Sequence, residues 1–348
     1  MDFARSDEEK ALAEALAQIL GDVCSPARIR AWEADQVSFD DGFVSAVAGG
    51  GFLEAGLSFG DAPQFGVLAQ LEEVAGRFLA PQLLSWQSAY AAFLLGDHPL
   101  ASKVASGQLV APLVPGRSEL RLDGDRLSGA ADGVPFLDRA SALLIPLPSQ
   151  LALVPLPQQW ERFGEGAVAD GLKAELVQTQ SLVPQWRLTF DQTPAEVLAV
   201  APDRSAQALN RLRTCLAAWA TGAGSQAIEL ASAYARERVQ FDHPIGSYQS
   251  VQNRLVDAAI QLEQARMLVY RAAALIDGGD PAAEDVSRLA KHHAGKAFAQ
   301  AARGALMTFG GYGFTVDFDI QLYFRQAKEA QLSFEPRPSW ELVPGFRS

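Results

Sequence analysis

The sequence predicts a mainly helical chain with a β domain inserted between two helical regions. Apolar residues recur at helical spacing over the first hundred residues, while prolines and alternating apolar residues accumulate from about 109 to 190. From residue 203 the helical spacing returns in longer stretches. We therefore expect an N-terminal helical domain at 1–105, a middle β domain at 106–200 and a C-terminal helical bundle at 201–348.

Composition narrows the class of protein before any motif is considered. The 348 residues are 49% hydrophobic and 20% charged, which suits a large core. A net charge of −12 argues against nucleic acid as a partner, because a phosphate backbone needs a concentrated lysine and arginine face. Two distant cysteines, Cys24 and Cys215, indicate neither a disulfide framework nor a cysteine-based metal site. The acidic first residues and the lack of a long apolar run predict a cytoplasmic protein with no membrane segment.

Short packed helices are expected in the N-terminal region. Ser6 and Glu9 have the spacing of a capping box, and apolar residues follow at helical intervals: Leu12, Leu16, Ile19, Leu20 and Val23. Glycine and proline breaks separate further helices, which we expect over 43–57, 68–79 and 83–95.

The middle region is typical of an antiparallel barrel or sandwich. Its short alternating segments are bounded by proline, glycine and aspartate, and lie at 109–114, 119–122, 126–129, 142–147, 151–156 and 186–190. Asp123 and Gly124 between two of these segments predict a β-hairpin.

Three long helices are expected in the C-terminal region, over 204–238, 251–276 and 281–307. The second has Leu255, Leu262, Val269 and Ile276 seven residues apart, with alanines at 258, 265 and 272 between them. Alanine there allows close approach of neighbouring helices, which favours a bundle. The adjacent His292 and His293 would point about 100° apart on a helix, so we expect no metal site.

The stretch from Tyr234 to Gln252, YARERVQFDHPIGSYQSVQ, has two interpretations. A helix ends near Arg238, a turn follows, and a new helix starts around Ser247. Arg238 at a helix terminus can reach an anion with a bidentate guanidinium, and Phe241 offers a flat face beside it. The same pattern also fits an ordinary corner between two helices with a surface ion pair.

A second stretch, FGGYGFTVDFDIQLYFRQAK at 309–328, is rich in glycine. Glycines at 310, 311 and 313 allow positive φ and close backbone approach, so their amides can point at a phosphate. Taken alone the pattern is more typical of a turn, and it lacks the context of a Rossmann or P-loop fingerprint.

Together and in this order, the two stretches resemble the acyl-CoA dehydrogenase family. The matching patterns are RxxFxxPIGxxQxxQ, followed about 70 residues later by GGxGFT and LYFRxAK, and EEVAGRFLAPQ at 72–82 also resembles the family's N-terminal segment. The resemblance covers nearly the whole chain. It implies N-terminal helices, a middle β-barrel domain and a C-terminal four-helix bundle.

The resemblance also implies FAD as cofactor, bound between the β domain and the bundle, with its adenine and pyrophosphate end held by the neighbouring subunit. By resemblance, Arg238 contacts the pyrophosphate, Phe241 packs at the adenine, and the same region is lined by Gln240, Ile245 and Gln249. The backbone of Gly310 and Gly311 would lie against the dinucleotide from the opposite side. Met307 departs from the pattern, because the family often has Gln there.

The family reaction is α,β-dehydrogenation of a CoA thioester, in which a carboxylate removes the α-proton and the flavin accepts a hydride. In many members the base lies about nine residues after the arginine that corresponds to Arg325, where this chain has Phe334. Glu335 is one position later and would serve only if the loop bulges. Other members place the base on the first long bundle helix, where this chain has Leu212.

Two other features of active members are missing. A loop like TEPxxGSD, which contacts the flavin ring, is reduced here to Pro115–Ser118, and the tail after Glu335 has no match to the segment that grips FAD. The residues for a neighbour's cofactor are therefore kept, whereas those for the chain's own flavin and substrate are eroded.

This asymmetry predicts the non-catalytic subunit of a hetero-oligomer, such as the α2β2 assemblies known in the family, which often act on steroid side chains or other bulky CoA thioesters. The resemblance implies an electron-transferring flavoprotein as the electron acceptor. Two alternatives stay open: an active homo-oligomeric dehydrogenase that uses Glu335 as base, and a structural or regulatory homologue that binds no flavin. Whether the chain alone is an enzyme is left open.

Overall fold

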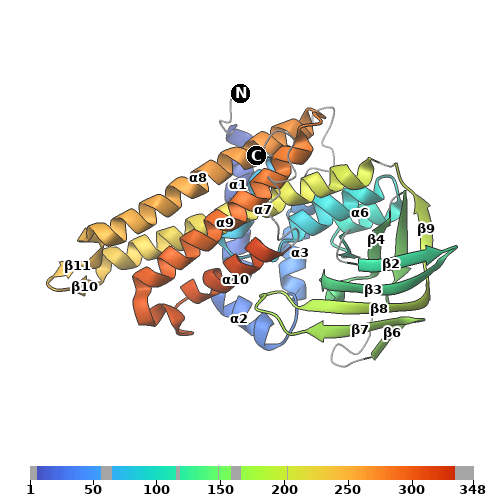
Figure 1. Cartoon of the computed structure of the whole chain (residues 1–348), viewed down its shortest axis with the longest axis horizontal. Helices are drawn as coiled ribbons and strands as arrows, with labels where there is room; N and C mark the ends of the chain where they lie inside the picture. Colours follow the sequence, from blue (N-terminus) through green and yellow to red (C-terminus); the bar gives the residue numbers. More distant parts are fainter. Residues whose placement is uncertain are drawn as a thin grey trace, which may run out of the picture. The chain divides into compact units, whose positions relative to one another are not determined.

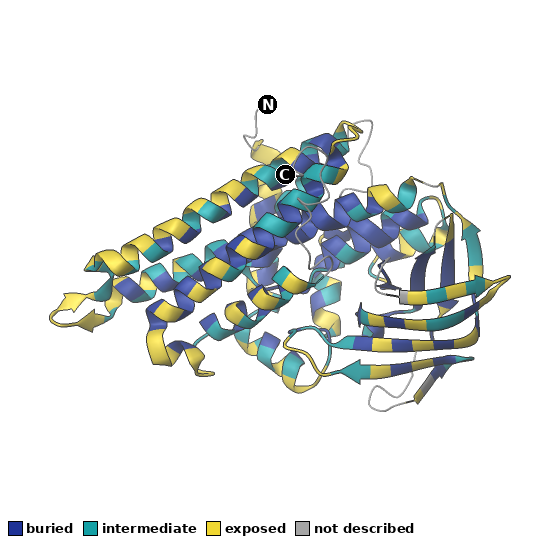
Figure 2. Ribbon diagram, in the orientation of Figure 1, coloured by how far each residue is buried: buried dark blue, intermediate teal, exposed yellow. Residues whose placement is uncertain are grey.

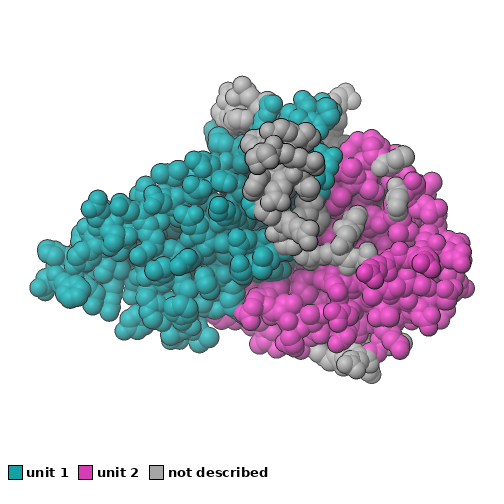
Figure 3. All heavy atoms as spheres, in the orientation of Figure 1, with its two compact units in different colours: residues 1–26, 58–82, 210–348 teal, residues 27–57, 83–209 magenta. Residues whose placement is uncertain are grey.

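The structure, a computed structural model, describes residues 6–55, 65–114, 118–147, 149–157, 166–201 and 203–333. The chain divides into two compact units, each built from segments that are distant in the sequence (Figure 3). The first unit contains residues 1–26, 58–82 and 210–348, and the second contains residues 27–57 and 83–209. The N-terminal helices are thus divided between the units, while the three-domain boundaries at 105 and 200 stay a prediction.

The first unit is a helical bundle (Figure 1). It is formed by most of α7 (Arg204–Glu237), α8 (Gln249–Asp277), α9 (Ala283–Phe309) and α10 (Ile320–Leu332), together with α1 (Asp7–Val23) and α4 (Phe65–Arg77). The predicted capping box is present at α1, where Ser6 accepts from the Glu9 amide and Glu9 accepts from the Ser6 amide. The expected four-helix bundle is confirmed. Pro281 lies in the turn before α9 instead of beginning that helix.

The alanine seam of α8 lies in the core of this unit, as predicted. Ala258, Ala265 and Ala272 are buried, and so are Leu255, Leu262 and Val269. Small side chains along this face allow α8 and α9 to pack closely along their length.

Two glycines allow α4 and α7 to cross with their backbones in contact. A Cβ atom added to Gly76 would lie 2.0 Å from the Trp219 carbonyl oxygen, and one added to Gly222 would lie 1.8 Å from the Glu73 carbonyl oxygen. No side chain larger than hydrogen fits at either position without displacing a helix.

Polar contacts fasten α4 to α8. Asp277, the last residue of α8, accepts hydrogen bonds from the Phe65 and Gly66 amides at 2.9 and 3.0 Å and so caps the N-terminus of α4. Farther along, the buried Glu73 accepts from Arg266 at 2.7 Å and from the Tyr270 hydroxyl at 2.9 Å. Helices about 200 residues apart in the sequence therefore satisfy each other's polar groups by hydrogen bonds.

The second unit contains short helices and two sheets (Figure 1). The helical elements are α2 (Pro26–Ala34), α3 (Asp41–Gly49), η1 (Phe52–Glu54), the π-helix η2 (Leu84–Ala92), α5 (Phe93–Leu95), α6 (Pro99–Ala105) and η3 (Leu137–Arg139). The four-stranded sheet has the order β1 (Ala111–Pro112), β4 (Ala142–Leu147), β5 (Gln150–Pro155) and β9 (Glu196–Ala199). The five-stranded sheet has the order β2 (Ser118–Asp123), β3 (Arg126–Pro135), β8 (Gln185–Pro194), β7 (Leu172–Val177) and β6 (Gly166–Ala169).

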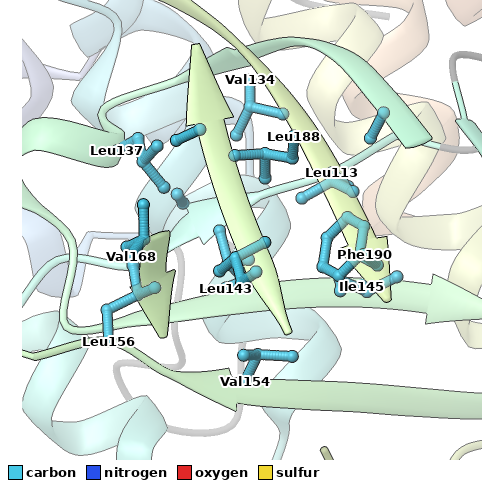
Figure 4. Close-up of a cluster of buried hydrophobic side chains, with 14 of the residues drawn as sticks. Leu113, Val134, Leu137, Leu143, Ile145, Val154, Leu156, Val168, Leu188 and Phe190 are labelled. Carbon is cyan, nitrogen blue, oxygen red and sulfur yellow. The ribbon is translucent and has the colours of Figure 1, made fainter. Parts of the chain in front are cut away.

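The two sheets enclose one apolar core. Figure 4 shows Leu143, Ile145 and Val154 from the first sheet gathered with Leu188 and Phe190 from the second. Asp123 pairs with Arg126 across a two-residue turn, which confirms the predicted hairpin between β2 and β3. Alternation of inward apolar and outward polar residues along β8 is what fixes its register.

Several predicted elements differ from the structure. Only Ala111 and Pro112 of the segment 109–114 form a strand, and they pair in parallel with β4. The strands β6, β7 and β9 were not predicted, although Leu172, Ala174 and Leu176 of β7 alternate with charged residues as a half-buried strand requires. The helix expected over 83–95 is present, but most of it is π-helical.

Candidate functional site

The first predicted motif forms a hairpin at the end of α7. Strands β10 (Val239–Gln240) and β11 (His243–Pro244) pair so that Phe241 and Asp242 make up the turn. Both turn residues have positive φ, 54° and 66°, which is the backbone of a type I′ turn. Glycine and asparagine are usual in such turns, and a phenylalanine there holds a strained backbone. The Phe241 side chain is 87% exposed.

The second motif follows α9 as the short 3₁₀ helix η5 (Gly310–Phe314). Gly310 has φ 64° and ψ −142°, a conformation that favours glycine. A Cβ atom added to Gly310 or Gly311 would meet nothing within 4 Å among the described residues. The backbone of these two glycines is therefore open to a molecule that approaches from outside the chain.

An aromatic cluster brings the two motifs together at one end of the bundle. Tyr234 of α7 stacks on Phe309 of α9 with ring centres 4.3 Å apart, and Phe318 packs against both. Tyr312 of η5 packs on the other side of Phe318, at 6.0 Å. The Arg238 guanidinium then lies 5.5 Å from the centre of the Tyr312 ring. This geometry holds the cation over a ring at a half-exposed position.

The structure places all seven predicted cofactor residues in this region of the first unit, and none of them is buried. They are Arg238, Gln240, Phe241, Ile245, Gln249, Gly310 and Gly311. The surface around them is unusually apolar for a bundle end, because Val239, Met307, Phe314 and Val316 are each more than half exposed. A cation surrounded by exposed apolar side chains suits a ligand that carries both an anion and flat rings.

Sequence reasoning missed the residues that hold the hairpin. The Tyr248 hydroxyl donates to the Gln240 carbonyl oxygen at 3.0 Å, and the Ile245 amide donates to the Arg238 carbonyl oxygen at 2.8 Å. Tyr312 of η5 supports the Arg238 guanidinium from the second motif. The one sequence feature that could have indicated this role of Tyr248 is its position just before α8, from which its hydroxyl can reach the backbone of the hairpin.

The candidate base Glu335 lies outside the described residues. The alternative position, Leu212, is completely buried in the core, and Leu216, one turn later, is also buried. Near the end of α10, the buried Lys291 ammonium donates to the carbonyl oxygens of Ala330 and Ser333 at 2.9 and 2.8 Å. Lys291 therefore satisfies the carbonyl groups of the last helical turn before that segment.

Burial perturbs several ionisable groups of the bundle. Burial lowers the pKa of Arg211, whose guanidinium lies 4.5 Å from the centre of the Phe65 ring. Burial raises the pKa of the Cys215 thiol, and the nearby Glu72 acts in the same direction. Burial lowers the pKa of His293, as does Lys296. These groups lie on helices of the bundle, and none of the described His, Cys, Asp or Glu residues forms a cluster that could hold a metal ion.

The second unit has a small pocket on its β domain. Its lining includes Trp86, Pro112–Val114 and Ala131–Val134. These residues belong in part to the passage where the family carries its flavin-contacting loop, and of that passage residues 115–117 lie outside the described residues. The residues of 112–114 are apolar and offer no side-chain hydroxyl.

Comparison with known proteins fits this geometry. A family model described as acyl-CoA dehydrogenase, C-terminal domain, matches residues 203–333, which contain both motifs and the bundle. Residues 203–333 are therefore similar to the C-terminal domain of acyl-CoA dehydrogenases. The chain is 36% identical over 124 residues to the probable acyl-CoA dehydrogenase FadE25 of Mycobacterium tuberculosis. It is 40% identical over 124 residues to an acyl-CoA dehydrogenase of Bacillus subtilis. Each match covers 36% of this chain and 32% of the relative, so it spans about a third of the curated proteins.

Solved structures extend the likeness in fold to nearly the whole chain. The Tcur3481-Tcur3483 steroid ACAD variant is 28% identical, with a TM-score of 0.80 and coverage of 93% of both chains. The ChsE4-ChsE5 complex from Mycobacterium tuberculosis is 22% identical, with a TM-score of 0.81 and coverage of 96% of this chain and 94% of that chain. At that identity the second likeness shows the fold alone. No described helix is long and apolar enough to cross a membrane.

Proposed function

We propose that this chain is the non-catalytic subunit of a heteromeric acyl-CoA dehydrogenase, and that it holds the adenine and pyrophosphate end of FAD bound to a catalytic partner chain. The observation that carries the proposal is the meeting of Arg238, Phe241 and the open Gly310–Gly311 backbone at one end of the bundle. These residues fit a dinucleotide, because a guanidinium suits a diphosphate and an exposed ring suits a purine.

Each residue has a separate task in this arrangement. Arg238 binds the diphosphate, and Tyr312 keeps its guanidinium in place. Phe241 packs on the adenine, and the tight hairpin presents its ring outward. Gly310 and Gly311 let the dinucleotide approach the backbone, while Gln240, Ile245 and Gln249 line the same region. FAD supplies hydride acceptance when it is bound in the complex.

The proposed non-catalytic role is supported by the residues at the two positions where related sequences carry the catalytic base. Leu212 is a core residue and cannot accept a proton. Glu335 follows Phe334 and precedes Pro336, so it is displaced from the position of a base in related sequences. The partner chain then provides the carboxylate and the thioester site. Two solved relatives are named for paired components, ChsE4-ChsE5 and Tcur3481-Tcur3483, which favours an α2β2 assembly for this chain.

The test is the flavin content of the chain alone and of the chain co-expressed with an acyl-CoA dehydrogenase encoded beside its gene. We expect little FAD alone and about one FAD per heterodimer. One FAD per chain in a homo-oligomer, with turnover abolished by Glu335→Gln, would establish the active homo-oligomer instead. Absence of FAD even with the partner, and no effect of Arg238→Ala, would establish a homologue that binds no flavin.

Three variants sharpen this test. In the complex, Arg238→Ala should weaken FAD binding by about tenfold or more, because it removes a charge-assisted contact. Arg236→Ala is the control, since Arg236 is exposed two residues earlier on α7. Gly311→Ala should leave the free energy of unfolding unchanged and still lower FAD content, because its methyl group meets nothing in this chain. Equal FAD content in all three variants would contradict the assigned role of this surface.

A further inference from the structure

The exposed face of α9 is basic, although the chain carries a net charge of −12. The sequence contains no aspartate or glutamate from residue 286 to residue 316. The exposed cations of this stretch, Lys296 and Arg303, lie two helical turns apart on one face. Figure 2 shows buried and exposed positions alternating along α9, as expected of a helix with one face in the core. A local excess of positive charge in an acidic chain indicates a surface that meets an anion.

A glycine on α9 brings a second arginine to this face. A Cβ atom added to Gly304 would lie 3.2 Å from Cγ and 3.5 Å from Cδ of Arg254, a residue of α8. The aliphatic part of Arg254 therefore crosses α9 at the residue next to Arg303. Glycine inside a long helix is unfavourable by about 1 kcal/mol relative to alanine. At Gly304 it leaves room for the Arg254 side chain to pass.

Both arginines lack a counter-charge within the described part of the chain. Arg303 is exposed and Arg254 is partly exposed, and neither makes an ion pair or a hydrogen bond to a described residue. Arg77 of the same unit, by contrast, pairs with Glu229. Neighbouring cations without a carboxylate repel each other, and a bound anion removes that cost.

We propose that Arg254 and Arg303, which meet at Gly304, form a binding site for a phosphate group. Each guanidinium can donate two parallel hydrogen bonds to phosphate oxygens. A phosphate monoester carries about −1.5 to −2 charge at neutral pH, which matches two cations, whereas a carboxylate carries a single negative charge. Met307, one turn after Arg303 and 52% exposed, gives the site an apolar edge. This chemistry fits free inorganic phosphate or the phosphate of a nucleotide.

The site is distinct from the surface proposed to hold FAD. Arg238 lies at the end of α7 beside Tyr312, whereas Arg254 and Arg303 lie more than one helical turn inside α8 and α9. Neither of these two arginines is among the residues assigned to the dinucleotide. The inference therefore does not depend on the proposed cofactor role.

The test is isothermal titration calorimetry of the purified full-length chain with inorganic phosphate, ADP and acetate at one ionic strength. We expect saturable binding of phosphate and ADP, with acetate about tenfold weaker or more because it carries one charge. ADP binding tighter than phosphate by about threefold or more would identify a nucleotide as the occupant, through an apolar contact with Met307. A smaller difference would identify free phosphate. Both outcomes support the site.

Four variants separate the geometry of the site from net charge. Arg303→Ala and Arg254→Met should each raise the phosphate dissociation constant about tenfold, because each removes a charge-assisted contact. Lys296→Ala is the matched control, since it removes an exposed cation from the same face and should change the constant less than about twofold. Gly304→Ala keeps the net charge and should weaken binding about threefold or more, because its methyl group displaces the aliphatic part of Arg254.

Three results would each overturn the inference. They are no saturable phosphate binding up to about 10 mM, equal losses in Lys296→Ala and Arg303→Ala, and an unchanged dissociation constant in a Gly304→Ala chain that circular dichroism shows to be folded. Failure of the cofactor proposal would appear in the flavin content of the complex, whereas failure of this site would appear in phosphate binding to the chain alone. The two failures are therefore distinguishable.

Discussion

The Arg238 guanidinium lies 5.5 Å from the centre of the Tyr312 ring, and this contact joins two motifs that are 74 residues apart in the sequence. Each motif taken alone fits an ordinary turn. Their contact places a cation, an open glycine backbone and an exposed phenylalanine on one surface. A dinucleotide carries a diphosphate that the cation can bind and flat rings that can pack on the phenylalanine.

Removing the ring of Tyr312 should weaken the cofactor site. Tyr312→Ala removes the support beneath Arg238, which is worth about 0.5–2 kcal/mol, so FAD should dissociate from the complex about two- to thirtyfold more readily. Tyr312→Phe keeps an aromatic face and should retain most of the affinity. Flavin fluorescence released on dilution measures the difference, and equal release from both variants would refute a role for the ring.

The hairpin turn should show a trade-off between stability and cofactor binding. Phe241→Gly relieves the strain of a left-handed backbone and should raise the free energy of unfolding by about 0.5–1 kcal/mol, while lowering FAD content because the exposed ring is lost. Asp242→Gly is the matched control, since it relieves the same kind of strain and keeps Phe241. Denaturant unfolding and flavin absorbance test both; a Phe241→Gly complex with full FAD content would contradict the role of the ring.

The crossing of α4 and α7 should not tolerate a methyl group. Gly222→Ala should lower the free energy of unfolding by about 3 kcal/mol, because the added carbon overlaps the Glu73 carbonyl oxygen. Gly49→Ala, at the end of α3, meets nothing within 4 Å and should be neutral or slightly stabilising. Urea unfolding of the two variants decides this, and similar midpoints would show that the helices separate easily.

Stability should fall on mild acidification because of the helix histidines. Burial lowers the pKa of both His292 and His293 below the usual 6.5, and Lys296 acts in the same direction. The unfolded chain therefore binds more protons than the folded chain just below pH 6.5, so the free energy of unfolding decreases as the pH falls from 6.5 toward the folded pKa values. His293→Gln should flatten this part of the profile, and unchanged unfolding curves between pH 7 and 5 would show that the histidine does not contribute.

Much of the fold follows from local pattern, and the failures have physical reasons. The long helices were predicted to within a few residues, because heptads and proline positions mark them directly. Strand β6 was missed because it spans only four small residues, whereas β7 does alternate apolar with charged residues and could have been predicted; its pairing with β8 depends on residues elsewhere in the chain. The exact course of α4 could not be predicted, because its N-terminal cap, Asp277, lies on another helix.

The same limit applies to the candidate site. Arg238, Phe241 and the two glycines could be selected from residue type and spacing. The support from Tyr312 and Tyr248 depends on contacts across the bundle end, and no spacing rule encodes it.

The cap that Asp277 places on α4 has a consequence for biosynthesis. The amides of Phe65 and Gly66 donate to the carboxylate of Asp277, which is synthesised 212 and 211 residues later. Nascent chains that end before α8 must leave that helix terminus to water or to a chaperone. A stalled or truncated product would therefore keep its early helices undocked, and protease sensitivity around residue 65 would report whether translation had passed residue 277.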